Sequence, residues 1–245
     1  MEEHVRALVD ADWEARLGVE RSVLRSGGVQ VVAAALGAND AMSFLLDETC
    51  IVVVPAGEVE SARATLAGLD ARAAFTSDTL RRLVGSGAQI DGPSWHSYVD
   101  ARCFLGTADH SVQPADGDLT PLLEFLDGND FAERGESGFP RVLGSADPET
   151  TRFWILREDD RVVAAGNMTD WRGLPADVGV LTEPSRRGQG LARRLVGTMV
   201  ADALPAVAVV RYRALASNVA SLALAQRLGF EPYGQNFRAR RPPPM

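Results

Sequence analysis

Residues 178–192 read VGVLTEPSRRGQGLA, and this stretch decides how the rest of the sequence is interpreted. The β-branched and apolar residues up to Thr182 predict a strand, and the periodic apolar residues from Leu191 onward predict a helix. Between them lies a tight loop that contains Gly188 and Gly190. Because glycine has no Cβ, the main chain of such a loop can come close to a bulky anion.

The predicted helix, residues 191–204, begins where a phosphate group would be held. Its first backbone N–H groups have no acceptor within the helix, and the helix dipole adds partial positive charge there. The guanidinium of Arg187 can add a full charge. The loop is not a P-loop, because no Gly-Lys-Ser/Thr follows, and its glycine spacing differs from the dinucleotide-binding fingerprint.

With Arg187 first, residues 187–192 fit the pattern Gln/Arg-x-x-Gly-x-Gly/Ala, and here the chain resembles the GNAT superfamily of acyl-CoA N-acyltransferases. A second stretch of the sequence supports this resemblance. Residues 211–232, RYRALASNVASLALAQRLGFEP, look like the family's later strand, its Asn-containing helix and the Leu-Gly-Phe before a final strand. The resemblance covers residues 119–240. More loosely, the chain is similar to actinobacterial members that carry a further domain in front of this fold.

The resemblance implies that acetyl-CoA is the donor and that the loop binds its pyrophosphate. The implied donor-binding residues are Val180, Leu181 and Thr182 on the strand, Arg187, Gly188, Gln189, Gly190, Leu191 and Ala192 in the loop, and Asn218 and Ser221 on the later helix. We expect the strand at 177–182 to splay from the strand at 207–215, with pantetheine in the gap. One backbone N–H near Leu181 would stabilise the oxyanion.

An ammonium is not a nucleophile, so a base or a water chain must take a proton from the acceptor. Asp177 is the first candidate, because members of the family often carry an acidic residue on this strand. Glu183 and Asp170 are weaker candidates, and each of these acids is also compatible with a solvated surface position.

The general acid of many family members is missing here. Their Tyr near the end of the later helix, which protonates the leaving thiolate, is replaced by Ala225. Tyr233 and Ser221 are the candidate substitutes for this catalytic role. Two alternatives stay open, since a CoA thiolate can leave without much help, and the replacement is also compatible with weak or lost activity.

The order of predicted elements favours an α/β (α+β) fold, with a mixed, mostly antiparallel sheet flanked by helices. In the second half, a helix at 119–126 precedes a hairpin of strands at 152–158 and 161–168, which flank Asp159-Asp160. A helix at 218–228 and a strand at 237–240 end it. The first half predicts helices at 5–17, 19–25, 58–69 and 78–83, and strands at 29–36 and 49–54.

The polar residues 108–118 are the predicted boundary between two domains. Residues 1–110 would form a smaller mixed α/β domain and residues 118–241 the acyltransferase domain. The first domain carries no chemical motif. It is open to three interpretations: a wall of the substrate pocket, a homodimer contact, or a degenerate second acyltransferase-like unit.

Composition argues against several classes of protein. A formal net charge of −8 makes nucleic acid and anionic membranes poor partners. Cys50 and Cys103 match no metal-ligand spacing, and three scattered histidines predict no metal site. No signal peptide is recognised, and no apolar run approaches the ~20 residues of a membrane helix. We expect a cytoplasmic protein.

The leading hypothesis is transfer of an acetyl group from acetyl-CoA to a primary amine of a small molecule, by direct attack in a ternary complex. A protein or peptide N-acetyltransferase is the nearest rival in mechanism. The second class of function is a non-catalytic acyl-CoA-binding module. It remains an alternative because Ala225 replaces the tyrosine that acts as general acid in many family members. A nucleotide-binding protein is the third.

Overall fold

The computed structural model describes residues 1–33, 41–139, 151–171 and 174–241. By its contacts the chain divides into two compact units. The C-terminal unit comprises Met1, Ser97–Arg213 and Val219–Glu231, and the N-terminal unit comprises Glu2–His96, Ala214–Asn218 and Pro232–Met245. This division passes through strands rather than through the polar stretch 108–118, and the end of the chain returns to the N-terminal unit. Domains at 1–110 and 118–241 stay a prediction.

The N-terminal unit contains both helices and strands. Its elements are α1 (Glu3–Leu17), α2 (Arg21–Leu24), β1 (Gly28–Ala33), β2 (Ala41–Leu46), β3 (Thr49–Val54), η1 (Ala56–Glu58), α3 (Val59–Leu66), α4 (Ala71–Ala74) and α5 (Ser77–Val84). The predicted helices at 5–17, 58–69 and 78–83 and the strand at 49–54 are confirmed as α1, α3, α5 and β3, with small differences at the helix ends. The helix at 19–25 is a single turn, α2, and residues 34–36 of the predicted strand lie outside the described residues.

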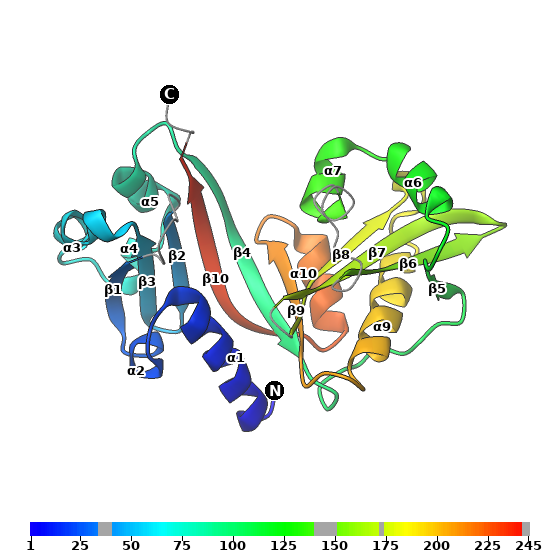
Figure 1. Cartoon of the computed structure of the whole chain (residues 1–245), viewed down its shortest axis with the longest axis horizontal. Coiled ribbons are helices and arrows are strands. Elements are labelled where there is room, and N and C mark those ends of the chain that lie inside the picture. The colour runs from blue at the N-terminus through cyan, green and yellow to red at the C-terminus, as the bar shows by residue number, and fades with distance from the viewer. Residues whose placement is uncertain (34–40, 140–150, 172–173, 242–245) are drawn as a thin grey trace. The chain divides into compact units, whose positions relative to one another are not determined.

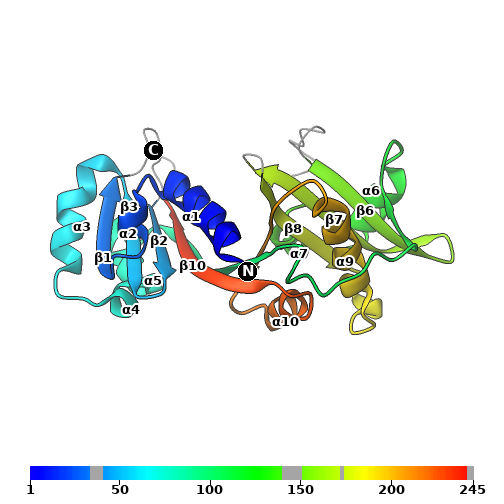
Figure 2. The same cartoon turned by 90° about the horizontal axis from the view of Figure 1, so that it is seen from below.

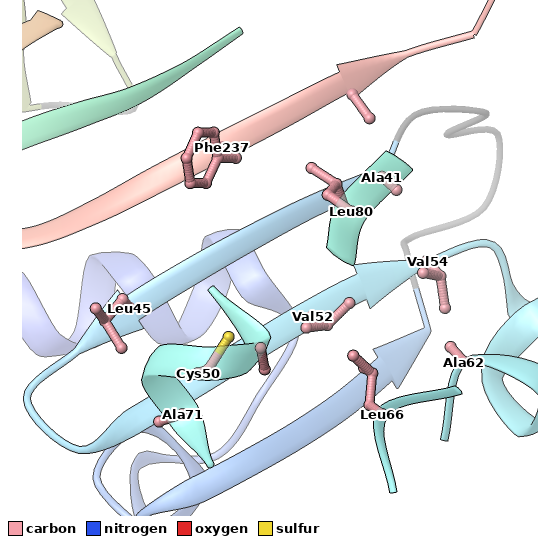
Figure 3. Close-up of a cluster of buried hydrophobic side chains, with 12 residues drawn as sticks. Ala41, Leu45, Cys50, Val52, Val54, Ala62, Leu66, Ala71, Leu80 and Phe237 are labelled. Atoms are coloured by element: carbon pink, nitrogen blue, oxygen red, sulfur yellow. The ribbon is translucent and has the colours of Figure 1, made fainter. Parts of the chain in front are cut away.

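One core cluster of the N-terminal unit lies between a face of its sheet and three helices. β1 is parallel to β3, and β2 is antiparallel to β3 and to β10 (Glu231–Arg240). Figure 3 shows Val52 of β3 among side chains from α3, α4 and α5, including Leu66 and Leu80. Burial raises the pKa of the Cys50 thiol to about 12, so this cysteine serves as a small apolar residue.

A six-stranded sheet has the order β1-β3-β2-β10-β4-β9, with β4 at Gln89–Val99 and β9 at Val210–Leu215. The remaining elements belong to the C-terminal unit. They are β5 (Val112–Pro114), α6 (Thr120–Asp127), α7 (Phe131–Glu136), β6 (Thr151–Glu158), β7 (Arg161–Trp171), β8 (Leu174–Thr182), η2 (Pro184–Arg186), α9 (Leu191–Ala203) and α10 (Val219–Arg227). Asp159 and Asp160 both have positive φ, 48° and 61°, as the predicted two-residue hairpin turn requires.

The second sheet has the order β5-β6-β7-β8, and all its neighbours are antiparallel. Successive residues of β7 face opposite sides. Ala165 packs with Ile155 and Leu181 in a cluster that includes α6. Gly166 faces α9, where a Cβ would collide with Met199. Figures 1 and 2 show α6 and α9 on opposite faces of this sheet. The predicted fold class, a mixed and mostly antiparallel α/β arrangement flanked by helices, is confirmed.

Candidate functional site

The glycine loop, residues 187–192, joins β8 to α9 after the single turn of η2. Gly188 and Gly190 have φ of 77° and 82°, which is the left-handed region that favours glycine. A Cβ at either position would meet no other atom within 4 Å, so the loop is open at both glycines. The predicted order of strand, loop and helix is present, and Gly190 caps α9.

The start of α9 presents backbone donors to this opening. The Gly190 carbonyl accepts from the N–H groups of Arg193 and Arg194, at 3.0 and 3.1 Å. The N–H groups of Leu191 and Ala192 come before the first bond that a helix can close. α9 has 13 residues, enough for a helix dipole to place partial positive charge here. A phosphate-sized anion therefore fits the glycine loop.

The guanidinium of Arg187 lies at the loop and already forms an ion pair with a carboxylate of the protein. Its Nη2 donates to Glu133 Oε2 of α7 at 2.6 Å, and its Nε lies 3.5 Å from the Thr182 carbonyl oxygen. Both side chains of the ion pair are partly exposed, Arg187 at 48% and Glu133 at 39%. Solvent screening therefore keeps the pair weak, and a more highly charged anion can compete for Arg187.

The other arginines around the loop serve to hold it. Arg186 donates to Gln189 Oε1 at 3.1 Å and pairs with Glu158 at the end of β6. On α9, Arg194 donates to Asp109 Oδ2 at 2.7 Å. Hydrogen bonds from Arg194 and Ser111 hold the pKa of Asp109 well below its usual range, so this carboxylate stays ionised.

A cleft of about 570 Å³ adjoins the glycine loop. Its wall contains Gly190, Arg193 and Arg194 on one side, and residues 106–110 and Leu228 on the other. The Arg193 side chain is exposed, whereas Arg194 is held by Asp109. A ligand anchored by its phosphates at Gly190 therefore has a cavity with a cation beside it.

β8 is an edge strand of its sheet among the described strands, so one side of its backbone has no strand neighbour. Val180, Leu181 and Thr182 pair on the other side with Gly166, Ala165 and Ala164 of β7. The Leu181 side chain is buried in the core against α6. β9 lies at the edge of the other sheet, so no described ladder joins β8 to β9. The expected gap between them stays a prediction.

The ladder between β7 and β8 is interrupted close to the candidate base. Asn167 pairs with Gly179 and Thr169 pairs with Ala176, so one residue of β7 opposes two of β8. Such a bulge bends a strand and changes where its groups point. Asp177 is one of the two bulged residues, and its side chain lies outside the described part of the structure. Its role as the base stays a prediction.

The other acids have surface settings. Asp170 is exposed. Glu183 accepts hydrogen bonds from Arg161 at 3.0 Å and from Ser185 at 3.1 Å. These contacts favour the interpretation of both acids as surface residues.

Tyr212 is a feature that the sequence does not indicate. It is buried on β9, and its hydroxyl lies 2.8 Å from that of Ser221 on α10. Burial raises the pKa of Tyr212 more than the Ser221 hydrogen bond lowers it, so the phenol stays protonated near neutral pH. Ala225, one turn after Ser221, is itself buried and carries no proton donor. The sequence places Ser221 in the stretch that resembles the family, but it does not indicate that Tyr212 on the preceding strand is its hydrogen-bond partner.

Tyr233 has a different environment from the one predicted. Its hydroxyl donates to Asp10 of α1 at 2.6 Å within the N-terminal unit, and Arg25 donates to the same carboxylate at 2.8 Å. These bonds favour a structural role for Tyr233 over a catalytic one.

Asn218 is exposed just before α10 and is assigned by its contacts to the N-terminal unit. Whether it contacts a donor stays a prediction.

No group of three or more His, Cys, Asp or Glu side chains among the described residues could hold a metal ion. No helix that they form has both the length and the apolar character needed to cross a bilayer.

Comparisons with known proteins agree with this geometry. The model of the acetyltransferase (GNAT) family matches residues 120–230. No curated protein matches the chain. The structure of a GCN5-related N-acetyltransferase from Kribbella flavida is similar with a TM-score of 0.51 at 18% identity, covering 97% of this chain and 96% of that one. A conserved protein of unknown function from Staphylococcus epidermidis has a TM-score of 0.52 at 13% identity, covering 67% of each. At these identities the structural likenesses bear on the fold alone.

Proposed function

We propose that the protein transfers an acetyl group from acetyl-CoA to a primary amine of a small molecule, because residues 120–230 match the model of the acetyltransferase (GNAT) family. The observation that carries this proposal is the glycine loop. Gly188 and Gly190 are open to solvent in the conformation that favours glycine, at the N-terminus of α9. In this family such a loop takes the pyrophosphate of CoA.

Acetyl-CoA supplies an activated thioester when it is bound. Residues 187–192 would hold its pyrophosphate through backbone N–H groups and the Arg187 guanidinium. The main chain of Val180, Leu181 and Thr182, at the edge of β8, would pair with the pantetheine arm. A backbone N–H of this strand would donate to the carbonyl oxygen as negative charge develops on it.

The amine nitrogen would attack the thioester carbonyl carbon, forming the C–N bond as the C–S bond breaks. One proton must leave the nitrogen, and Asp177 is our candidate to accept it, directly or through water. The bulge at Asp177 supports this choice, because such irregularities often redirect side chains at active sites. Holding amine and thioester together supplies much of the rate gain by positioning.

The leaving thiolate takes up a proton, and Ser221 is our candidate donor because Ala225 offers none. The Ser221 hydroxyl lies 2.8 Å from that of Tyr212, and burial keeps Tyr212 protonated. Ser221 would thus donate its proton to the thiolate sulfur and recover one from Tyr212, and the Tyr212 phenolate would regain a proton from solvent before the next turnover. This pair is a better candidate than Tyr233, whose hydroxyl is bonded to Asp10.

Release of free thiol from acetyl-CoA in the presence of a broad panel of small-molecule amines, amino acids and peptides tests the proposal. We expect thiol release that depends on a small amine. Turnover with peptides alone would favour the protein or peptide acetyltransferase. Binding of CoA without acylation of any member would favour the non-catalytic module. Thermal protection by ATP or NAD but not by CoA would favour a nucleotide-binding protein.

A further inference from the structure

The glycine loop already holds an anion that belongs to the chain itself. Glu133 Oε2 accepts a hydrogen bond from Arg187 Nη2 at 2.6 Å. A carboxylate oxygen and a phosphate oxygen are alike as partners for guanidinium, since both are anionic acceptors of its N–H groups. Glu133 therefore occupies a donor that a pyrophosphate at this loop would use.

The backbone of Glu133 is fixed from the start of its helix. Asp130 caps α7, and its Oδ1 accepts from the N–H groups of Ala132 and Glu133 at 2.8 and 3.2 Å. Such a cap stabilises the first turn of a helix. The carboxylate of Glu133 is thus presented to Arg187 from a defined position.

The far end of α7 is also held. The Ser137 carbonyl accepts a hydrogen bond at 3.0 Å from the side-chain amide of Asn167, which is 2% exposed on β7. Opposite Asn167 on β8 is Gly179, where a Cβ would collide with this carbonyl and with Asn167 itself. The end of α7 therefore rests directly on β8, and the helix cannot simply swing away from the loop.

Two of the other described arginines next to the loop have separate partners. Arg186 pairs with Glu158 and Arg194 with Asp109. Neither of those carboxylates belongs to α7. Glu133 is the carboxylate that forms an ion pair with Arg187.

We propose that Glu133 is an internal competitor of the donor, which the pyrophosphate of CoA must displace from Arg187 before it binds. The proposal rests on the proposed function of the loop. It makes Glu133 a residue that sets donor affinity. Because Arg187 and Glu133 are 48% and 39% exposed, the competition is modest in size.

Calorimetric titration with CoA tests the proposal. Glu133→Gln should lower the Kd for CoA about two- to fivefold, the range that a partly exposed ion pair gives. The gain should shrink at high salt, because screening weakens the pair in the wild type. Pantetheine, which lacks the pyrophosphate, should bind the two proteins alike.

Glu136→Gln is the matched control, because it removes the same charge from an exposed position on the same helix. It should change the Kd for CoA much less. In an Arg187→Gln background, Glu133→Gln should have no further effect, since the two residues act through one contact. An unchanged or raised Kd in Glu133→Gln, or an equal gain in Glu136→Gln, would overturn the inference and leave the proposed function standing. Absence of CoA binding to the wild type would overturn both.

Discussion

The hydroxyl of Tyr233 donates a hydrogen bond to the buried carboxylate of Asp10, at 2.6 Å, across 223 positions of sequence. The bond joins the last strand, β10, to the first helix, α1. Arg25 donates to the same carboxylate at 2.8 Å. A residue near the end of the sequence therefore stabilises the N-terminal unit. The domain boundary consequently cannot be located from the family motif alone, because the strand that follows the motif belongs to the N-terminal unit.

Tyr233→Phe should lower the free energy of unfolding by about 1.5–3 kcal/mol near neutral pH, since it removes a hydrogen bond to a buried charge and keeps the ring. Burial opposes ionisation of Asp10, but bonds from Arg25 and Tyr233 bring its pKa below the ordinary 3.8. Because the pKa of Asp10 is lower in the folded protein than in the unfolded chain, its ionised carboxylate stabilises the fold at pH values above the ordinary pKa. That contribution is lost as the pH falls through the pKa that Asp10 has in the folded protein. The effect of the substitution should therefore be full at about pH 7 and shrink below about pH 4.

Urea unfolding at several pH values measures this. Tyr212→Phe is the comparison, because its hydroxyl bonds to a neutral partner, Ser221, and the loss should not depend on acid pH in the same way. An effect of Tyr233→Phe that is constant down to about pH 3 would exclude Asp10 as its cause. A loss of turnover at unchanged stability would return Tyr233 to the catalytic candidates.

Asp177→Asn should lower kcat while leaving the Kd for acetyl-CoA unchanged, if Asp177 takes the proton from the amine. The expected loss is about 10²- to 10⁴-fold, the usual contribution of a general base. Steady-state turnover measured from about pH 6 to pH 9 checks it, because removal of a base also removes the corresponding limb of the pH profile. Unaltered turnover across that range would remove Asp177 from the mechanism.

Ser221→Ala should lower kcat and spare acetyl-CoA binding if Ser221 is the proton donor, because it removes the hydroxyl that would pass the proton from Tyr212 to the thiolate. The loss should be smaller for donors with a better leaving group, since such a thiolate needs less protonation. Turnover with acetyl-CoA and with an aryl thioester makes the comparison. Equal losses with both donors would assign Ser221 to donor binding or to packing instead of proton transfer.

The glycine loop was predictable because the information is local. A β-branched stretch, two glycines and a helical apolar pattern lie within 15 residues, and each constrains the backbone by itself. The hairpin at Asp159 and Asp160 was predictable for the same reason, since both residues tolerate the positive φ that the turn demands.

Features that depend on distant partners were not predictable. Glu133 lies 54 positions before Arg187, and nothing in the sequence connects them. β2 reads AMSFLL and is almost wholly buried, so it lacks the alternation that marks a strand. The polar stretch 108–118 suggested a boundary on composition, whereas the compact units follow contacts between distant parts of the chain, and the end of the chain returns to the N-terminal unit.

Gly190→Val should abolish tight binding of acetyl-CoA and leave the protein folded. The added Cβ meets no atom within 4 Å, so it causes no collision in the protein, but it stands where the pyrophosphate would approach. The left-handed φ of 82° adds about 1–3 kcal/mol of backbone strain. Gly117→Val is the matched control, because Gly117 has a φ of 85° and is equally open, in a different loop, the one between β5 and α6.

The central claim is that the glycine loop holds the pyrophosphate of an acyl-CoA donor. Calorimetric titration of acetyl-CoA into the wild type, Gly190→Val and Gly117→Val tests it most directly. We predict one saturable site in the wild type and in Gly117→Val, and a loss of at least about tenfold in affinity in Gly190→Val, which corresponds to 1.4 kcal/mol or more. Equal affinity in Gly190→Val and the wild type would contradict the assignment of the loop.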